Sequence, residues 1–479
     1  MPHPYHTLDQ ADIAAIVAMT DPDRVLVGTS IPDEYYHDEM PEYGCFMPEL
    51  YVEALNTREV SSIMAYAYEH NIPVTARGAG TGLAGGATCK YGGILLSLMK
   101  MNHIQEVDRQ NLTITAQAGA LLTDVAEKAA QAGLFYPPDP GERTASIGGT
   151  IITNAGGMRA VRYGVTRDYV RCIEAVLPDG SIVNFSSNVA KNTTGYDIKD
   201  LIIGSEGTLC IATQVTLRLI PAPHATRTLV LTYDSIEPCI DTVPKLLQTP
   251  FVPTAIEFLE RELTDIVEHR LNKPFPVQEG NDFLIVMYDA SSVQEVEAAC
   301  EMACQIALEM GALDVKICDS QERMDSVWSV RAAILEGMKA DSDSQEECDV
   351  VVPRAKIADF VKAAQAIGRK YKIRVIVCGH AGDGNIHTEM LRNDMTDEEW
   401  KANTKACLKE LYAKSKELGG QLSGEHGIGN GRLEFLEEFV GKRMYALYQS
   451  VKLAFDEKLI LNPGKLILFD QNQPKNHSE

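Results

Sequence analysis

Two glycine-rich stretches in the second half of the chain carry side chains that can bind a divalent metal ion. "CGHAGDGNIH" contains His380 and His387, and "LSGEHGIGNGR" contains Glu425 and His426. Two imidazoles and a carboxylate are a common ligand set for an ion with open coordination positions, as in catalytic zinc and non-haem iron sites. A single loop histidine is more often a hydrogen-bonded residue than a ligand. Because only 11 histidines occur in 479 residues, three in these two motifs favour a metal site.

The first stretch has the pattern of a strand, a turn and a returning strand. "IRVIVCG" predicts a buried strand that leads to His380. Gly382 and Gly384 allow the chain to reverse, and "NIHTEM" carries His387 on the way back. A tight reversal can place both imidazoles on one side.

A third glycine-rich stretch, "RGAGTGLAGG" (77–86), could bind a diphosphate. Glycines at 78, 80 and 82 allow backbone amides to face one site without obstruction by side chains. The spacing differs from the Gly-x-Gly-x-x-Gly of nicotinamide-binding folds, and an ordinary glycine-rich turn remains an alternative for this loop alone. Residues 136–170 and 192–211 are similarly rich in glycine and small polar residues. Three such segments favour a chain that wraps around a large polar and aromatic cofactor.

Alternating helix and strand patterns predict more than one domain, as the chain length also does. The breaker "IPAP" (220–223) marks a boundary, and the strand–helix alternation after it predicts an antiparallel sheet with helices on one face. The polar segment 341–349 predicts a loop, and 434–457 a final helix. We expect an N-terminal helical segment, a cofactor-binding domain, a cap domain and a C-terminal segment that returns to the first domain, over 1–37, 38–222, 223–430 and 431–479.

Composition narrows the functional classes. The chain is 45% apolar and 23% charged, as folded soluble proteins are, and its formal charge of −23 argues against binding nucleic acid or anionic lipid. It has no apolar run of about 18 residues and no signal-peptide pattern at the start, so we expect a cytoplasmic protein without an integral membrane segment. The 11 cysteines are scattered, and Cys300 and Cys304 have no second pair nearby, so an iron–sulfur cluster is not expected.

Together these segments resemble the FAD-linked oxidases with the vanillyl-alcohol oxidase type of flavin fold. They look most like the branch with the glycolate oxidase catalytic subunit and the D-lactate and D-2-hydroxyglutarate dehydrogenases, over about residues 38–467. The resemblance implies an α+β fold, with a two-lobed FAD-binding domain and an antiparallel-sheet cap. Because Ala79 and Gly80 stand where some relatives have a histidine, FAD should be bound non-covalently. The residues that match FAD-binding positions are Arg77, Gly78, Ala79, Gly80, Thr81, Gly82, Pro138, Asp139, Ser146, Gly149, Thr153, Gly156, Glu206, Gly207 and Ile211.

The resemblance also assigns roles to the motif histidines. His380, His387 and Glu425 match the ligands of one divalent ion (Fe²⁺, Zn²⁺ or Mn²⁺), and His426 matches the catalytic base, which removes the hydroxyl proton while hydride passes to FAD. Arg331 matches the arginine that binds the substrate carboxylate, although the residues alone favour a surface helix arginine at this position. Trp328, Arg354 and Asn385 are further candidates for substrate binding.

Two acidic positions point to the substrate. Relatives that use 2-hydroxyglutarate have a lysine and an asparagine where this chain has Glu347 and Glu389. Carboxylates there would repel a second acid group, so we expect a short 2-hydroxy monoacid, with lactate favoured over glycolate.

The electron acceptor is the next expectation. The motifs look most like lactate dehydrogenases of anaerobic bacteria that pass electrons to an electron-transferring flavoprotein, which can couple lactate oxidation to NAD reduction by electron confurcation. An iron–sulfur subunit, a quinone and oxygen are the alternatives, and a homodimer is open. A nicotinamide-dependent dehydrogenase and a non-enzymatic metal or flavin carrier are competing interpretations.

Overall fold

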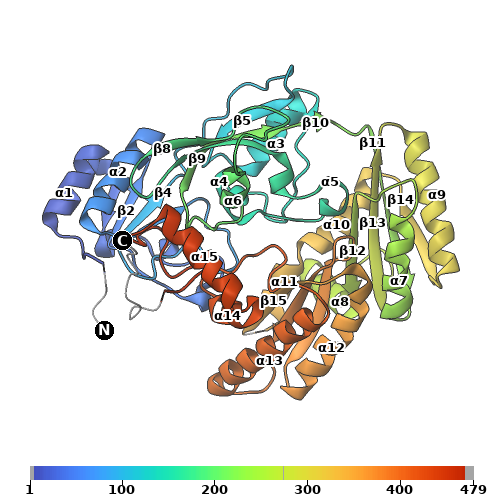
Figure 1. Cartoon of the computed structure of the whole chain (residues 1–479). Coiled ribbons are helices and arrows are strands. Elements are labelled where there is room, and N and C mark those ends of the chain that lie inside the picture. The colour runs from blue at the N-terminus through green and yellow to red at the C-terminus, as the bar shows by residue number, and fades with distance from the viewer. Residues whose placement is uncertain (1–4, 273, 343, 470–479) are drawn as a thin grey trace.

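The computed structural model describes residues 5–272, 274–342 and 344–469, and the chain forms two halves that lie side by side (Figure 1). The first half contains small sheets with short helices. The second half is built on one large sheet, and the red C-terminal helices lie between the halves. Among the described helices, none is both long and apolar enough to cross a membrane.

The first lobe of the N-terminal half delivers the glycine loop. In the described part of the chain its sheet has the order β1-β2-β4-β3, and β4 runs parallel to both β2 and β3. Helix α2 starts after Asn56, whose side chain accepts hydrogen bonds from two amides of the first turn. The loop 78–86 follows the carboxyl end of β3, next to β4. The elements are β1 (Val25–Val27), β2 (Leu50–Glu53), β3 (Val74–Arg77), β4 (Ile94–Ser97), α1 (Gln10–Met19) and α2 (Thr57–His70).

The second lobe is an antiparallel sheet of order β5-β9-β7-β8, with a short β10-β6 pair beside it. Its core contains Ile114, Val125, Ile151 and Val215, so helices α3 and α4 pack on this sheet. This arrangement agrees with the predicted two-lobed half. The elements are β5 (Thr113–Gln117), β6 (Leu134–Phe135), β7 (Val170–Val176), β8 (Ile182–Phe185), β9 (Ile211–Arg218), β10 (Ile220–Pro221), α3 (Leu122–Gln131), α4 (Ile147–Thr153), α5 (Ala160–Tyr163) and α6 (Ile198–Ile202).

The cap is built on an antiparallel sheet, whose order within the described residues is β14-β11-β13-β12-β16-β17-β15. The strands are β11 (Ala225–Tyr233), β12 (Ala255–Glu260), β13 (Asp282–Ala290), β14 (Asp314–Cys318), β15 (Gln345–Val351), β16 (Arg374–His380) and β17 (Asn385–Leu391). The helices are α7 (Ile236–Leu247), α8 (Arg261–Leu271), α9 (Val293–Glu309), α10 (Gln321–Ala332), α11 (Ile334–Asp341), α12 (Ile357–Lys370) and α13 (Asp397–Glu417).

The predicted antiparallel cap sheet is present, but the prediction of helices on only one face is wrong. Leu284 and Val286 of β13 face a core shared with α7, α9, α12 and α13. Phe283 and Ile285 of the same strand face a second core, shared with α8, α10 and α11. The run "DFLIVMYDA" is apolar at successive positions, which is the pattern of a strand buried on both faces.

Two further expectations are corrected in the C-terminal half. The predicted loop 341–349 contains most of the edge strand β15, in which Glu347 and Asp349 are buried. The predicted final helix is divided at Gly441, whose φ of 82° ends α14 (Leu433–Val440) before α15 (Lys442–Phe455) begins. Helix α14 packs on the cap core, whereas Val451 and Phe455 of α15 pack on the second lobe.

Candidate active site

The β16–β17 hairpin brings His380 and His387 together. The strands pair so that His387 lies opposite Cys378, and the two imidazole centroids are 5.2 Å apart. The turn between them requires glycine at 384, because φ is +96° and a Cβ there would lie 2.1 Å from the Val352 carbonyl oxygen. The predicted strand–turn–strand is therefore present, with both imidazoles buried.

One buried carboxylate holds the second motif in place. Asp349 Oδ2 accepts hydrogen bonds from the Ser423 hydroxyl at 2.7 Å and from the backbone amides of Gly424, Glu425 and His426 at 2.9–3.1 Å. A carboxylate that accepts several amides and faces imidazoles keeps its charge, so the pKa of Asp349 is held far below its usual value despite burial. Its position brings the Glu425 side chain to the hairpin.

The three predicted ligands converge. Glu425 Oε1 lies 3.2 Å from His380 Nε2 and 3.4 Å from His387 Nε2, and one ligand atom from each residue lies within 4.8 Å of the others. The central spatial prediction from the sequence is that these motifs meet, and the structure places them together.

The other edges of these rings also fit a metal site. His380 Nδ1 lies 2.7 Å from Glu257 Oε1, and His387 Nδ1 lies 2.9 Å from Glu347 Oε1. Histidines that bind metals commonly donate their second ring nitrogen to a carboxylate, which leaves the first nitrogen free for the ion. Although burial lowers the pKa of His380, Glu257 and Glu425 raise it well above its usual value, so the site stabilises positive charge. His380, His387 and Glu425 would hold a divalent ion here.

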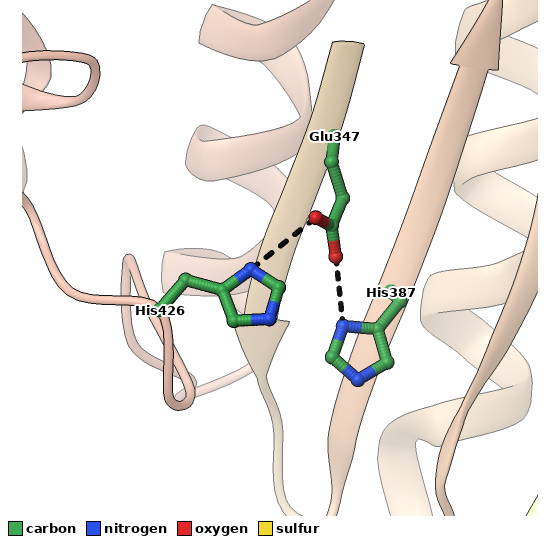
Figure 2. A group of neighbouring side chains, drawn as sticks. All are labelled: Glu347, His387 and His426. Carbon is green, nitrogen blue, oxygen red and sulfur yellow. Dashed lines mark hydrogen bonds and ion pairs between the residues drawn. The ribbon is translucent and has the colours of Figure 1, made fainter. Parts of the chain in front are cut away.

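His426 lies beside this group. Its ring is stacked on that of His387, with centroids 5.2 Å apart and planes at 20°. Nδ1 lies 3.2 Å from Glu347 Oε2, and Nε2 lies 3.8 Å from Glu425 Oε1. The contact with Glu347 is drawn as a dashed line in Figure 2. Burial lowers the pKa of His426, but the Glu347 and Asp349 carboxylates outweigh it and raise the pKa to about 9. The two carboxylates therefore stabilise the protonated form of this imidazole.

The proposed substrate residues are only partly brought to the site. Arg331 Nε donates to Glu257 Oε2 at 2.7 Å, and no described residue accepts a hydrogen bond from its two terminal nitrogens. They remain free for a carboxylate. The Trp328 indole donates to Thr228 of β11. This strand lies two strands away from β12, which carries Glu257 of the site, so the indole belongs to the cap core. Asn385 donates to Asp349 and to the Val350 carbonyl, and supports the loop.

Arg354 has a different place. It is exposed, and its Nε donates to the Gly382 carbonyl in the turn after His380. This contact supports the hairpin turn from outside.

The glycine loop is open for a diphosphate. Among the described residues, none accepts a hydrogen bond from the backbone amides of 79–83. Gly80 has φ of +80°, and a Cβ there would lie 2.2 Å from the guanidinium of Arg77. That guanidinium is buried and donates to the carbonyls of Glu34, His37 and Ala87. These hydrogen bonds hold the end of the glycine loop against the segment 34–37. Successive unpaired amides in such a loop fit the phosphates of FAD.

The segment 136–157 borders both the glycine loop and the metal-ligand group. Ser146 caps α4 by accepting from the Gly149 amide, and a Cβ at Gly78 would lie 2.0 Å from its hydroxyl. A Cβ at Gly156 would lie 2.8 Å from Glu425 Oε2, so glycine at this position leaves room for the Glu425 side chain as it stands. Three other predicted FAD-binding positions lie in this segment. Pro138 is buried, Asp139 is paired with Arg159 at 3.3 Å, and the Thr153 hydroxyl donates to the Gly149 carbonyl.

Glu206 joins the two halves. Its carboxylate accepts from the amides of Ile428 and Gly429, both at 2.7 Å, just after the Glu425–His426 pair. The amides of Asn430 and Gly431 donate to the carbonyl of Ala84 in the glycine loop. The carboxylate of Glu206 therefore holds the cap loop. Gly207 follows it with φ of 68°, and Ile211 is buried in the first-lobe core.

Three carboxylates of the site lay outside our assignment of ligands and base. Glu257 is an acid inside the buried, apolar part of the strand "AIEFLE", and a buried acid usually has a charged partner, so this pattern was a usable signal. Glu347 and Asp349 lie in the segment that the sequence predicts to be a loop. Their partners come from distant positions in the chain, and no local pattern indicates them.

Comparison with known proteins agrees with this arrangement. Residues 48–186 match the FAD binding domain model, and residues 222–466 match the model of the C-terminal domain of FAD-linked oxidases. The chain is 44% identical to a D-lactate dehydrogenase of Anaerostipes hadrus, covering 93% of this chain and 95% of that protein. It is 38% identical to a D-lactate dehydrogenase of Archaeoglobus fulgidus, covering 87% and 90%. It is 35% identical to the glycolate oxidase subunit GlcD of Bacillus subtilis, covering 91% and 92%.

Solved structures support the fold. p-Cresol methylhydroxylase with substrate bound aligns with a TM-score of 0.77 at 16% identity, over 96% of this chain and 97% of that one. 4-Ethylphenol oxidase from Gulosibacter chungangensis aligns with a TM-score of 0.73 at 16% identity, with the same coverage. The predicted α+β flavin fold is confirmed, and the chain belongs to the FAD-linked oxidase family of oxidoreductases.

Proposed function

We propose that this enzyme oxidises a short 2-hydroxy monoacid, D-lactate to pyruvate, with FAD as the hydride acceptor and one divalent ion at the site. The observation that carries the proposal is the convergence of His380, His387 and Glu425 beside His426, next to the FAD-binding half. Two of the relatives are D-lactate dehydrogenases, and a third is a glycolate oxidase subunit, which makes glycolate the second candidate.

The side chains divide the work on the substrate. When bound, FAD accepts the electron pair of the hydride, and the divalent ion makes the substrate hydroxyl more acidic. The free terminal nitrogens of Arg331 hold the carboxylate in a bidentate pair. His426 Nε2 takes the hydroxyl proton as the C2 hydrogen leaves with its electrons, and the Glu347 carboxylate near Nδ1 stabilises the imidazolium that forms.

The charge around the site favours a monoacid. Glu347 and Glu389 lie opposite each other in the β15–β17 pair and are both buried. Burial and the neighbouring Glu347 charge raise the pKa of Glu389 well above its usual value, so the repulsion of a second substrate carboxylate comes from Glu347. The expected substrates therefore have a short uncharged side chain, such as the methyl group of lactate.

The test uses purified, FAD-loaded enzyme under anaerobic conditions. D-lactate, L-lactate, glycolate and D-2-hydroxyglutarate are each added with a dye acceptor, and flavin bleaching and turnover are measured. D-lactate should give the largest kcat/KM, and turnover with none of the four acids would overturn the proposal. Arg331→Lys should raise the KM for the acid, because an ammonium group cannot form the bidentate pair. Arg323→Lys, an exposed arginine on the same helix, is the matched control.

We further propose that reduced FAD passes its electrons to an electron-transferring flavoprotein. The support is the likeness of the motifs to lactate dehydrogenases of anaerobic bacteria. In confurcation, NAD⁺ would accept electrons from two donors, the reduced FAD and reduced ferredoxin. Adding purified flavoprotein, NAD⁺ and reduced ferredoxin to the enzyme with lactate should produce NADH. No NADH in this mixture would favour the iron–sulfur subunit or a quinone as the acceptor.

A further inference from the structure

Glu347 directs each of its two carboxylate oxygens to the imidazole ring of a different histidine of the site. Oε1 lies 2.9 Å from His387 Nδ1, and Oε2 lies 3.2 Å from His426 Nδ1. Figure 2 shows the carboxylate between the two rings, with one oxygen directed to each. Its side chain is 9% exposed, so water competes little for these contacts.

The three imidazoles follow one pattern. Their Nε2 atoms all face Glu425 Oε1, at 3.2 Å from His380, 3.4 Å from His387 and 3.8 Å from His426. Their Nδ1 atoms all face a carboxylate on the other side. His380 has Glu257 for this purpose, whereas His387 and His426 share Glu347.

The contact with His426 is the weaker half of this bridge. His426 Nδ1 is buried and forms no well-aligned hydrogen bond with any described residue. The carboxylate oxygen beside it is Glu347 Oε2, at 3.2 Å. Catalytic hydrogen bonds are often poorly aligned before the substrate binds and tighten afterwards. A buried ring nitrogen with one carboxylate beside it has a clear preferred partner.

We propose that Glu347 is a positioning residue that orients the metal ligand His387 and the base His426 with a single carboxylate. Each oxygen accepts Nδ1–H of one ring, so both rings present Nε2 to the reactive side. Metal binding and proton removal then depend on the same side chain. The inference rests on the proposed function for the role of His426, but its metal-binding half does not require a substrate.

The chemistry of the carboxylate makes the proposal specific. Glutamine at this position offers one acceptor oxygen, and its amide NH₂ group would face the N–H of the other ring. In Glu347→Gln, the amide oxygen can therefore accept the Nδ1–H of one histidine, while the amide NH₂ group repels the Nδ1–H of the other. Glu347→Asp keeps both acceptor oxygens on a shorter side chain, and it should recover part of what Glu347→Gln loses.

The matched control is the preceding residue of the same strand. Glu346 is a partly buried carboxylate that accepts a hydrogen bond from the Tyr43 hydroxyl of the other half, and it contacts none of the three histidines. Glu346→Gln should leave metal affinity and kcat at the wild-type level. Comparing the two variants separates the loss of an acid on β15 from the loss of the histidine contacts.

The first measurement needs no turnover. Chelator-treated, FAD-loaded enzyme is titrated with Mn²⁺ and with Zn²⁺, and bound metal is measured by equilibrium dialysis. Glu347→Gln should bind the ion ~10–100-fold more weakly, as when a carboxylate partner of a ligating histidine is lost. Equal metal affinity in wild type and Glu347→Gln would overturn the link to His387, whether or not the enzyme oxidises lactate.

The second measurement is a double-mutant cycle at saturating metal. In the wild-type background, Glu347→Gln should lower kcat while the KM for D-lactate changes little. In the His426→Ala background the same substitution should have almost no further effect on kcat, because the ring that it orients is gone. An equal loss in both backgrounds would overturn the link to His426. Absence of lactate oxidation by the wild type would instead overturn the proposed function.

Discussion

Two glutamates of strand β12, three residues apart, have opposite electrostatic environments. Glu257 is fully buried, with His380 Nδ1 and Arg331 Nε each 2.7 Å from one of its oxygens. Burial raises its pKa, but these two groups lower it by more, and the net pKa lies below its usual value. Glu260 faces the other side of the sheet, where it accepts from the Val377 amide and lies near Asp282. Burial raises its pKa to about 7.

The difference shows what keeps a buried acid charged. Both glutamates lose water, and only the one at the active site has cationic partners that restore the stability of the ionised form. The charge of Glu257 fixes one ring edge of His380 and one nitrogen of Arg331. Glu260 has no such role at the site, and we expect its removal to affect stability and not turnover.

The largest effect is expected at the base, on the active-site side of the sheet. His426→Ala removes the group that takes the hydroxyl proton, and loss of a general base typically lowers kcat by ~10²–10⁴-fold. The flavin absorbance of the purified protein should be retained, since His426 lies on the cap. His269→Ala, an exposed histidine on α8, should behave as wild type. A decrease of less than tenfold in kcat would contradict the assignment of His426.

The second-largest effect is expected for Glu257→Gln, which removes the charge that distinguishes Glu257 from Glu260. Glu257→Gln leaves His380 and Arg331 to compete for one acceptor oxygen, so metal affinity should fall ~10–100-fold. The KM for the acid should rise as well, because Arg331 loses the contact that orients it. Dialysis against graded metal concentrations and steady-state kinetics measure the two effects. Glu260→Gln on the same strand is the matched control, and equal behaviour of the two variants would remove the distinction.

Glu260→Gln should have the smallest effect on turnover, and it should instead change how the stability of the protein depends on pH. The folded-state pKa of about 7 lies above the unfolded-state value of 4.5, so the folded protein holds the proton more tightly. The protonated Glu260 therefore contributes ~3 kcal/mol to the free energy of unfolding. This contribution is fully present below pH 4.5 and is lost as the pH rises to about 7. Urea midpoints should therefore decrease less between pH 5 and pH 8 in Glu260→Gln than in wild type. Parallel decreases would contradict the raised pKa.

Local patterns predicted the parts of the site that are local in the chain. The strand, turn and strand around His380 and His387 follow from apolar alternation and two glycines, and the structure has them. The open amides of the loop after Arg77 follow from glycine spacing. The convergence of Glu425 with the histidines was predicted from residue types and from the resemblance, since 38 residues separate it from His387.

The missed element, β15, shows the limit of such patterns. "QEECDVV" is too polar to be predicted as a buried strand, because each buried acid carries a desolvation cost that its own sequence does not offset. Glu347 and Asp349 are stabilised by imidazoles and amides from residues 385–387 and 423–426. The second helical face of the cap was missed for a related reason, since the apolar run of β13 fits either one or two cores.

The most direct test of the central claim is anomalous X-ray scattering from crystals of the FAD-loaded enzyme soaked with Mn²⁺. The account predicts one anomalous peak per chain, within coordination distance of His380 Nε2, His387 Nε2 and a Glu425 oxygen. The peak should vanish in His387→Ala. Active, FAD-loaded enzyme that carries no divalent ion between these three side chains would contradict the account.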